Sequence, residues 1–197
     1  MDDFDREGKE PRVQYFTATS ADGFIADQDN SLEWLFEVPR ERNDAWERFI
    51  GGVAVMAMGA TTYKWVLDHD RLLDNSGQWQ EYYADRPCWV FTHHDLPPVP
   101  GADLRFVSGD VVEVHAQMAQ AADGGNVWLV GGGDLVGQFD DAGLLDEIHL
   151  GLQPVFLGGG APLLPRRLAS DRVTLRVAQQ VGQTLRIVYD VESRSGR

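Results

Sequence analysis

The chain has 197 residues, of which 43% are hydrophobic and 24% charged, and its formal net charge is −14. This length and composition predict one globular domain, and no apolar run is long enough to span a membrane. The negative charge argues against nucleic acid or an anionic membrane surface as a partner. The single cysteine excludes a disulfide framework within one chain, and the charged N-terminus predicts a cytoplasmic location.

We expect residues 1–11 to form a disordered N-terminal tail and residues 12–192 to form a single domain without internal repeats. Alternating or continuous apolar runs predict the strands of this domain. These runs lie at residues 12–19, 24–26, 53–58, 87–92, 104–107, 127–130, 146–156, 173–180 and 184–191.

Helical spacing of apolar residues predicts helices between several of these strands. A short helical turn is expected at residues 32–36. We expect Pro39 to open the first long helix, and a threonine after Gly59 and the hydroxyl of Ser108 to cap two later ones. The polar stretch 68–86 is predicted to be a loop.

Strands that alternate with helices predict an α/β fold of three layers, with a mostly parallel central sheet and helices on both faces. The last two strands predict an antiparallel C-terminal hairpin. Ligands of open α/β sheets bind beyond the carboxyl ends of the strands. Three such ends, near Gly59, Thr92 and Gly131, carry small or hydroxyl residues and could form one edge.

The stretch 127–139, VWLVGGGDLVGQF, predicts a buried strand, a turn of three glycines and the start of a helix. Such a turn either binds nothing or brings backbone N–H groups close to a phosphate. It does not match the GxGxxG fingerprint. Because the chain is acidic, we expect any phosphate site to be made locally, mainly by backbone N–H groups.

Six segments, taken in order, resemble the dihydrofolate reductase fold. More closely, they resemble the reductase domain at the C-terminus of the bacterial riboflavin-pathway deaminase–reductase and its stand-alone relatives. No single segment is specific, but their order covers about residues 12–191. The segments are SADGFIA (20–26), MGATTY (58–63), VFT (90–92), VGGG (130–133), LLDE (144–147) and PVFLGGGAPL (154–163).

The resemblance implies a nicotinamide cofactor, usually NADPH, that lies across the strand ends. It implies that glycine and threonine main chain and hydroxyls hold the phosphates, and that Ala18 and Ile25 flank the nicotinamide ring. It also implies that the 131–132 peptide is cis. The implied cofactor residues are Ala18, Ile25, Gly59, Thr61, Thr62, Thr92, His93, Val130, Gly131, Gly132, Gly133, Asp134 and Leu135.

Two positions depart from the family pattern. Ala60 follows the Met-Gly pair, and His93 follows Thr92, where the family often has arginines that bind the 2′-phosphate of NADPH. Histidine is only partly cationic at neutral pH. The resemblance thus gives NADPH as the expected cofactor, and these two departures make NADH the alternative.

Reduction of a heterocycle needs a proton as well as a hydride. Asp44, on the first long helix, and Asp22 are the candidate catalytic carboxylates. Asp44 could instead belong to a solvated helix face, and Asp22 could bond the backbone of its own turn. Phe24 and Trp34 are candidate substrate contacts, although Trp34 is equally compatible with the core. The histidines lack metal-ligand spacing, so we expect no metal site.

The favoured function is an NAD(P)H-dependent reductase of a small heterocycle, of the pterin or ribosylamino-pyrimidine type. A true dihydrofolate reductase and a catalytically silent nucleotide-binding protein on the same fold are the alternatives. By analogy with the family, we also expect a homodimer.

Overall fold

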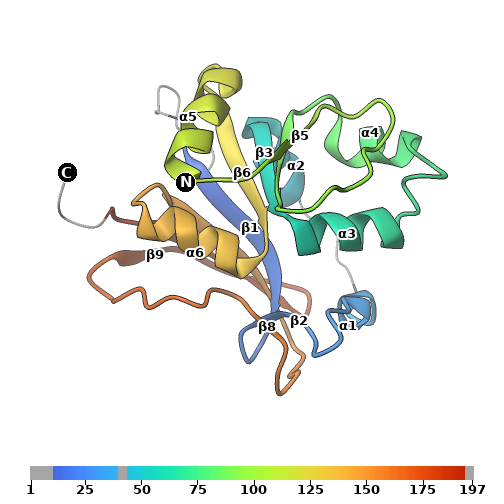
Figure 1. Ribbon diagram of the computed structural model, residues 1–197. Coiled ribbons are helices and arrows are strands. Elements are labelled where there is room, and N and C mark those ends of the chain that lie inside the picture. Colours follow the sequence, from blue (N-terminus) through green and yellow to red (C-terminus); the bar gives the residue numbers. More distant parts are fainter. Residues whose placement is uncertain (1–10, 40–43, 194–197) are drawn as a thin grey trace.

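A computed structural model describes residues 11–39 and 44–193 of the chain (Figure 1). Eight strands form one sheet in the order β5-β4-β3-β6-β1-β7-β10-β9, and β2 pairs with β8. The strands are β1 Val13–Ser20, β2 Phe24–Ala26, β3 Val53–Gly59, β4 Cys88–Phe91, β5 Leu104–Val107, β6 Asn126–Gly131, β7 Glu147–Gln153, β8 Ala161–Pro162, β9 Val173–Val181 and β10 Thr184–Val191. The helices are α1 Glu33–Phe36, α2 Ala45–Gly52, α3 Ala60–His69, α4 Gly77–Tyr83, α5 Val111–Ala122 and α6 Gly133–Asp141.

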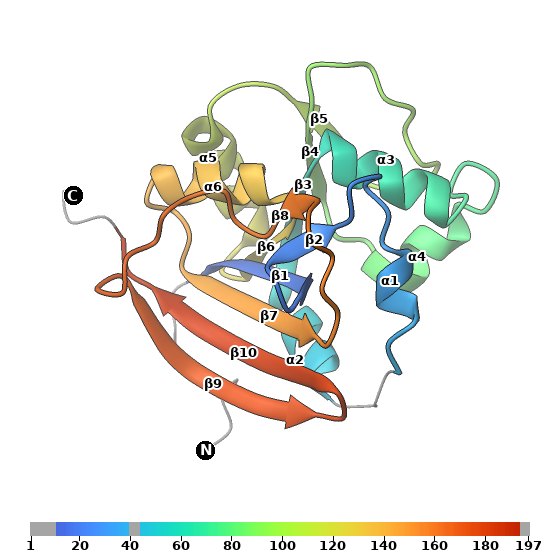
Figure 2. The ribbon, with the colours of Figure 1, turned by 90° about the horizontal axis from the view of Figure 1, so that it is seen from below.

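The sheet confirms the predicted α/β fold. Strands β1, β3, β4, β5, β6 and β7 pair in parallel, and β10 pairs antiparallel with both β7 and β9. Figure 2 shows the β9–β10 hairpin sweeping along one side of the molecule as the outer edge of the sheet.

Helices cover both faces because the inner strands are apolar on both sides. In β3, Val55 and Ala57 face a core formed with α5 and α6. The alternate residues Met56 and Met58 face a second core formed with α2, α3 and α4. All four side chains are fully buried.

Several local predictions are wrong. The polar stretch 68–86 contains α4, which is anchored by Trp79 at 1% exposure. Asp110, rather than Ser108, caps α5 through a hydrogen bond from the Val112 N–H. No threonine side chain caps α3, whose N-cap residue is Gly59.

Other predictions fall partly outside the described residues. The helix expected from Pro39 begins at Ala45 in the structure, and residues 40–43 between them are not described. Almost all of the tail predicted at residues 1–11 also lies outside the described residues. No helix in the described part of the chain is both long and apolar enough to cross a bilayer.

Candidate functional site

The two glycine-broken turns meet at one edge of the sheet. Gly59 ends β3 before α3, and Gly131 ends β6 before α6. A Cβ atom placed on Gly59 would lie 3.8 Å from the Gly132 backbone nitrogen. The Gly131–Gly132 peptide is cis. The starts of α3 and α6 therefore lie side by side and could face one ligand.

The central sheet opens beside this edge. Within the described residues, β1 pairs with β6 from Val13 to Tyr15. Beyond that point β1 continues along β7 as far as Ser20, while β6 continues along β3 to Gly131. The two strands separate towards their carboxyl ends, at the level of Thr17 and Val130. A gap between adjacent parallel strands is a place where a flat ring could enter the sheet.

Two clefts follow this edge. The outer cleft, of about 400 Å³, lies near the ends of β4 and β5, and its lining includes Gly59, Ala60, Thr61, Thr92, His93, Ser108, Gly132, Asp134 and Leu135. The inner cleft, of about 310 Å³, lies at the sheet opening, and its lining includes Thr17, Ile25, Thr61, Thr62, Trp65, Val130, Gly131, Gly132, Gly133 and Asp134. Thr61, Gly132 and Asp134 line both clefts, so the two form one continuous groove.

Two glycines shape this groove in different ways. A Cβ on Gly133 would lie 2.5 Å from the carbonyl oxygens of Pro162 and Leu163, so main chain packs directly on the first turn of α6. A Cβ on Gly132 would find nothing closer than 4.0 Å, where Ile25 and Thr62 lie. A side chain at Gly132 would therefore project into the groove, which its absence keeps open.

The polar groups of the groove suit a phosphate. Within the part of the chain that the structure describes, no side chain caps α3 or α6, and helix N-termini present unpaired N–H groups. The Asp134 carboxylate stands at the start of α6 and would oppose an anion. Arg166 Nη2 lies 3.3 Å from Asp134 Oδ1 and offsets part of this charge.

A third cavity, the side pocket, adjoins the inner cleft on the α2 face of the sheet. Its volume is about 280 Å³. Thr17 lines both the side pocket and the inner cleft, so the two cavities meet at this residue. The lining of the side pocket includes Phe16, Thr17, Ala18, Leu35, Trp46, His149, Gly151, Gln153, Thr184 and Arg186.

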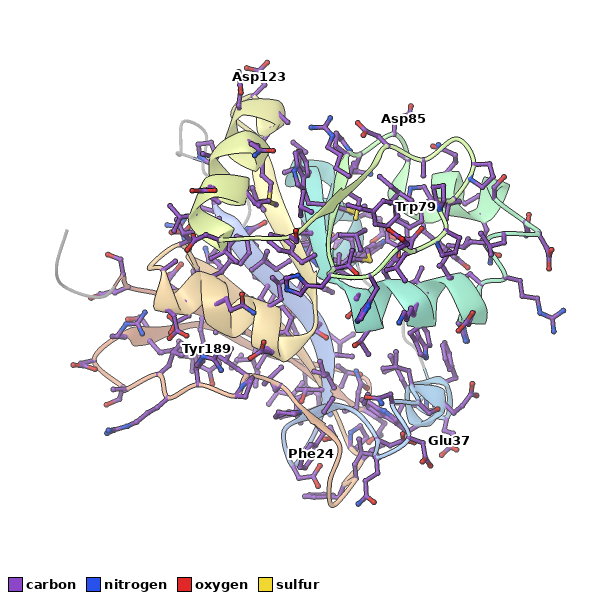
Figure 3. All side chains as sticks on the ribbon, viewed as in Figure 1. Phe24, Glu37, Trp79, Asp85, Asp123 and Tyr189 are labelled. Atoms are coloured by element: carbon purple, nitrogen blue, oxygen red, sulfur yellow. The ribbon has the colours of Figure 1, made fainter. Side chains whose placement is uncertain are left out.

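The structure therefore brings most of the predicted cofactor residues together. Ala18 is the one that does not line the groove, because it faces the side pocket. The two predicted substrate residues line none of the three cavities. Phe24 pairs with Pro162 in the β2–β8 ladder, and Figure 3 shows it at the end of the molecule that this ladder forms. Trp34 is 6% exposed within α1.

Neither candidate carboxylate lines these cavities. Asp22 accepts hydrogen bonds from Ser20 Oγ at 2.6 Å and from the N–H groups of Leu157 and Gly158 at 3.1 and 2.7 Å. These bonds, that from Ser20 foremost, lower the pKa of Asp22. The Asp22 carboxylate thus ties the β7–β8 loop to the turn before β2. Asp44 is 70% exposed and pairs with Arg48 at 2.7 Å.

The sequence prediction missed a buried polar network beneath the side pocket. Glu147 is 3% exposed and accepts hydrogen bonds from Arg12 at 2.6 Å and Gln14 at 2.7 Å. It also contacts His149 Nε2 at 2.7 Å and Arg176 at 3.1 Å. Burial alone would raise the pKa of Glu147, but His149, Arg176 and Gln14 together lower it to about 2. The sequence did carry a signal for this network, because polar residues recur on one face of a strand that lies inside the sheet.

The fold is that of an α/β protein of the dihydrofolate reductase type, with a continuous groove along one edge of its sheet. A model of the RibD C-terminal domain matches residues 11–187, and the chain belongs to this family.

Individual relatives agree with this assignment. The chain is 28% identical to the uncharacterized protein YwjB of Bacillus subtilis over 180 residues, which is 91% of this chain and 98% of that protein. It is similar to the crystal structure of a putative riboflavin biosynthesis protein from Shewanella sp. PV-4, with 25% identity, a TM-score of 0.74 and coverage of 93% and 99% of the two chains. It shares its fold with a dihydrofolate reductase from Enterococcus faecalis solved with NADP(H), at 14% identity, a TM-score of 0.55 and coverage of 94% and 97%.

Proposed function

We propose that the protein is an NAD(P)H-dependent reductase that transfers hydride to a small heterocyclic substrate. The observation that carries the proposal is the position of Thr17, which lines both the inner cleft and the side pocket. A redox cofactor and its substrate must touch at one point, and this is where the two cavities meet. The family assignment supports the same class of reaction.

The dinucleotide would lie along the groove with its phosphates on the first turns of α3 and α6. Thr61 and Thr62 offer hydroxyls there, and Gly132 leaves the space that the cofactor would fill. The nicotinamide ring would enter the sheet opening, near Ala18, Ile25 and Gly131. The cofactor supplies the hydride when bound, and the chain's own residues orient the two rings and exclude water.

NADPH is the proposed cofactor, with NADH accepted as well. The described residues that line the outer cleft include no lysine or arginine. Ala60 adds no charge, and His93 offers a weaker partner for the 2′-phosphate than an arginine would. The chain would therefore discriminate poorly between the two cofactors.

The side pocket is proposed to hold the heterocycle. Phe16 and Trp46 form an edge-to-face pair at 5.5 Å, and aromatic walls of this kind suit a flat ring. A pterin, as in a true dihydrofolate reductase, and a ribosylamino-pyrimidine remain the candidate types. Asp44 stays the proposed proton donor, with Asp22 as the alternative candidate, and the homodimer stays a proposal by analogy.

Energy transfer from tryptophan to bound NADPH or NADH tests cofactor binding, because Trp65 lines the inner cleft. Cofactor oxidation with dihydrofolate and with the riboflavin-pathway pyrimidine then tests turnover. Gly132→Val should abolish both signals. Gly77→Val, at a position with nothing within 4 Å of the added Cβ, is the matched control. Binding without turnover of any heterocycle would favour a silent nucleotide-binding protein, and absence of binding would overturn the proposal.

A further inference from the structure

Helix α6 carries three aspartates and no basic side chain. The arginines that pair with these aspartates come from the segment between β8 and β9. Arg172 Nη2 lies 2.6 Å from Asp140 Oδ1, and Asp140 is fully buried. Arg166 pairs instead with two exposed carboxylates, at 3.3 Å from Asp134 and 2.7 Å from Asp141. The two arginines therefore differ in setting, since Arg172 serves a buried carboxylate whereas Arg166 serves the surface beside the groove.

A glycine lets Arg166 lie against α6. A Cβ atom placed on Gly137 would lie 2.8 Å from Arg166 Cγ and 3.0 Å from Arg166 Cζ. The arginine side chain therefore runs along the helix surface, between Asp134 and Asp141. Glycine is unfavourable inside a helix, and here its missing side chain leaves the space that the arginine occupies. Arg166 Nη1 also donates to the Pro165 carbonyl at 2.9 Å, which further fixes the guanidinium.

The Asp134 carboxylate that Arg166 meets belongs to the proposed phosphate site. Asp134 lines both clefts of the groove, and among the described residues of the two linings it is the only acidic one. A carboxylate in the first turn of a helix is attracted by the same N–H groups that would bind a phosphate. Without a compensating cation, it would repel the phosphate. Arg166 lines neither cleft and reaches this carboxylate from outside the groove.

We propose that Arg166 is a positioning residue of the cofactor site, which balances the charge of Asp134 and so lets the first turn of α6 accept a dinucleotide phosphate. The effect is indirect, because the guanidinium pairs with the carboxylate rather than with the phosphate. Its contribution to the fold is small, since ion pairs between exposed side chains add little to stability. The inference rests on the proposed function and names a residue that tunes its cofactor affinity.

The test measures NADPH binding to the full-length native chain and its variants by energy transfer from tryptophan. Arg166→Gln should weaken binding by roughly 3- to 10-fold, because the Asp134 carboxylate then stands uncompensated beside the phosphate. Asp134→Asn should bind more tightly than the native chain. The double variant should bind at least as tightly as the native chain, because removal of the carboxylate removes the need for the arginine. A purely structural role of Arg166 would not be rescued in this way.

Ionic strength gives a second readout that a structural role would not move. The difference between Arg166→Gln and the native chain should shrink as salt is added, because salt screens charges near the surface. Arg166→Lys should retain part of the native affinity, because it keeps the charge but not the planar guanidinium. Arg105→Gln removes a cation from another exposed pair, that with Asp103, and is the matched control because Arg105 lines none of the three cavities. It should bind NADPH like the native chain.

Three results would each overturn the inference. They are unchanged binding in Arg166→Gln, a loss that persists in the double variant or at high salt, and binding by Asp134→Asn that is no tighter than native. The last does not depend on the folding of any arginine variant, because the Asp134 side chain is 70% exposed. Absence of NADPH binding in the native chain would instead overturn the proposed function, so the two failures are distinguishable.

Discussion

The groove is lined largely by main chain and small residues, whereas the side pocket is lined largely by large or polar side chains. Main chain and residues with small side chains form much of the groove: Gly59, Gly131, Gly132 and Gly133 line it, and the packing around Gly133 is backbone against backbone. Large and polar side chains form much of the side pocket, among them Phe16, Trp46 and Arg186. A main-chain surface recognises what all dinucleotides share, whereas side chains distinguish one substrate from another. If the side pocket holds the substrate, as proposed, differences in substrate within the family should arise mainly there.

The largest expected effect is on stability and concerns Glu147, which lies beneath the side pocket. The pKa of Glu147 is about 2 in the folded chain, against 4.5 ordinarily. Because folding lowers this pKa, the carboxylate stabilises the fold above about pH 4.5, and the contribution is lost as the pH falls towards 2. The difference corresponds to about 3 kcal/mol. Denaturant unfolding of the native chain at pH 7 and at lower pH should show this loss.

Glu147→Gln should lower the free energy of unfolding at pH 7 by about 3 kcal/mol, because Arg12 and Arg176 lose a buried partner. As the pH is lowered, the unfolding free energy of the variant should also fall less than that of the native chain, because the variant has no carboxylate at this position to protonate. Glu113→Gln, at an exposed position of α5, is the control for charge removal. If the unfolding free energy of Glu147→Gln and of the native chain falls equally with pH, the Glu147 carboxylate is not the source of the acid-induced loss.

The next effect concerns the groove. Gly133→Ala places a methyl group 2.5 Å from two carbonyl oxygens, so the 162–163 segment or α6 must move. We expect a loss of about 1–3 kcal/mol in unfolding free energy, together with weaker NADPH binding. Gly77→Ala, at a helix position where nothing lies within 4 Å of the added Cβ, is the control. If both variants bind NADPH like the native chain, α6 does not form the phosphate site.

The contrast between a groove made by main chain and a pocket made by side chains also explains what could be predicted from the sequence. The strand ends at Gly59 and Gly131 are visible because a glycine after an apolar run is a local signal, and the mostly parallel sheet follows from strands that alternate with helices. The network of Glu147 is not local, since Arg12 and Asp190 are 178 positions apart in the chain. Helix α4 was missed because its sequence is mostly polar, and tertiary packing of Trp79 fixes it.

The site residues divide in the same way. Glycines and threonines of the groove could be proposed in advance because they lie at or shortly after strand ends, in segments that resemble the family. Arg186 could not, since its position opposite Gly151 depends on the register between β7 and β10. Asp22 was a candidate for chemistry because of its type, yet besides Ser20 it accepts from Leu157 and Gly158 of the β7–β8 loop, more than 130 positions away.

A smaller effect should come from the outer cleft. The native chain should bind NADPH less than about tenfold more tightly than NADH, because no described arginine or lysine lines that cleft. Ala60→Arg should raise the preference for NADPH by about tenfold, the effect of one charge-assisted contact. Ala60→Gln, which adds length without charge, should leave the ratio unchanged. Titrations of both cofactors by energy transfer measure these ratios, and an unchanged ratio in Ala60→Arg would place the 2′-phosphate elsewhere.

The smallest effect is expected at Asp22. Its carboxylate holds Leu157 and Gly158, and through this loop it positions β8 against β2, whose residues Ile25 and Ala26 line the inner cleft. Asp22→Asn keeps one acceptor oxygen but removes the charge, so it should weaken cofactor binding modestly and leave turnover at saturating cofactor near the native value. Steady-state kinetics separates these effects, because a positioning residue changes the KM for the cofactor whereas a proton donor changes kcat. A collapse of kcat in Asp22→Asn with KM unchanged would identify Asp22 as the proton donor and would move the chemistry from the side pocket towards the β1–β2 turn.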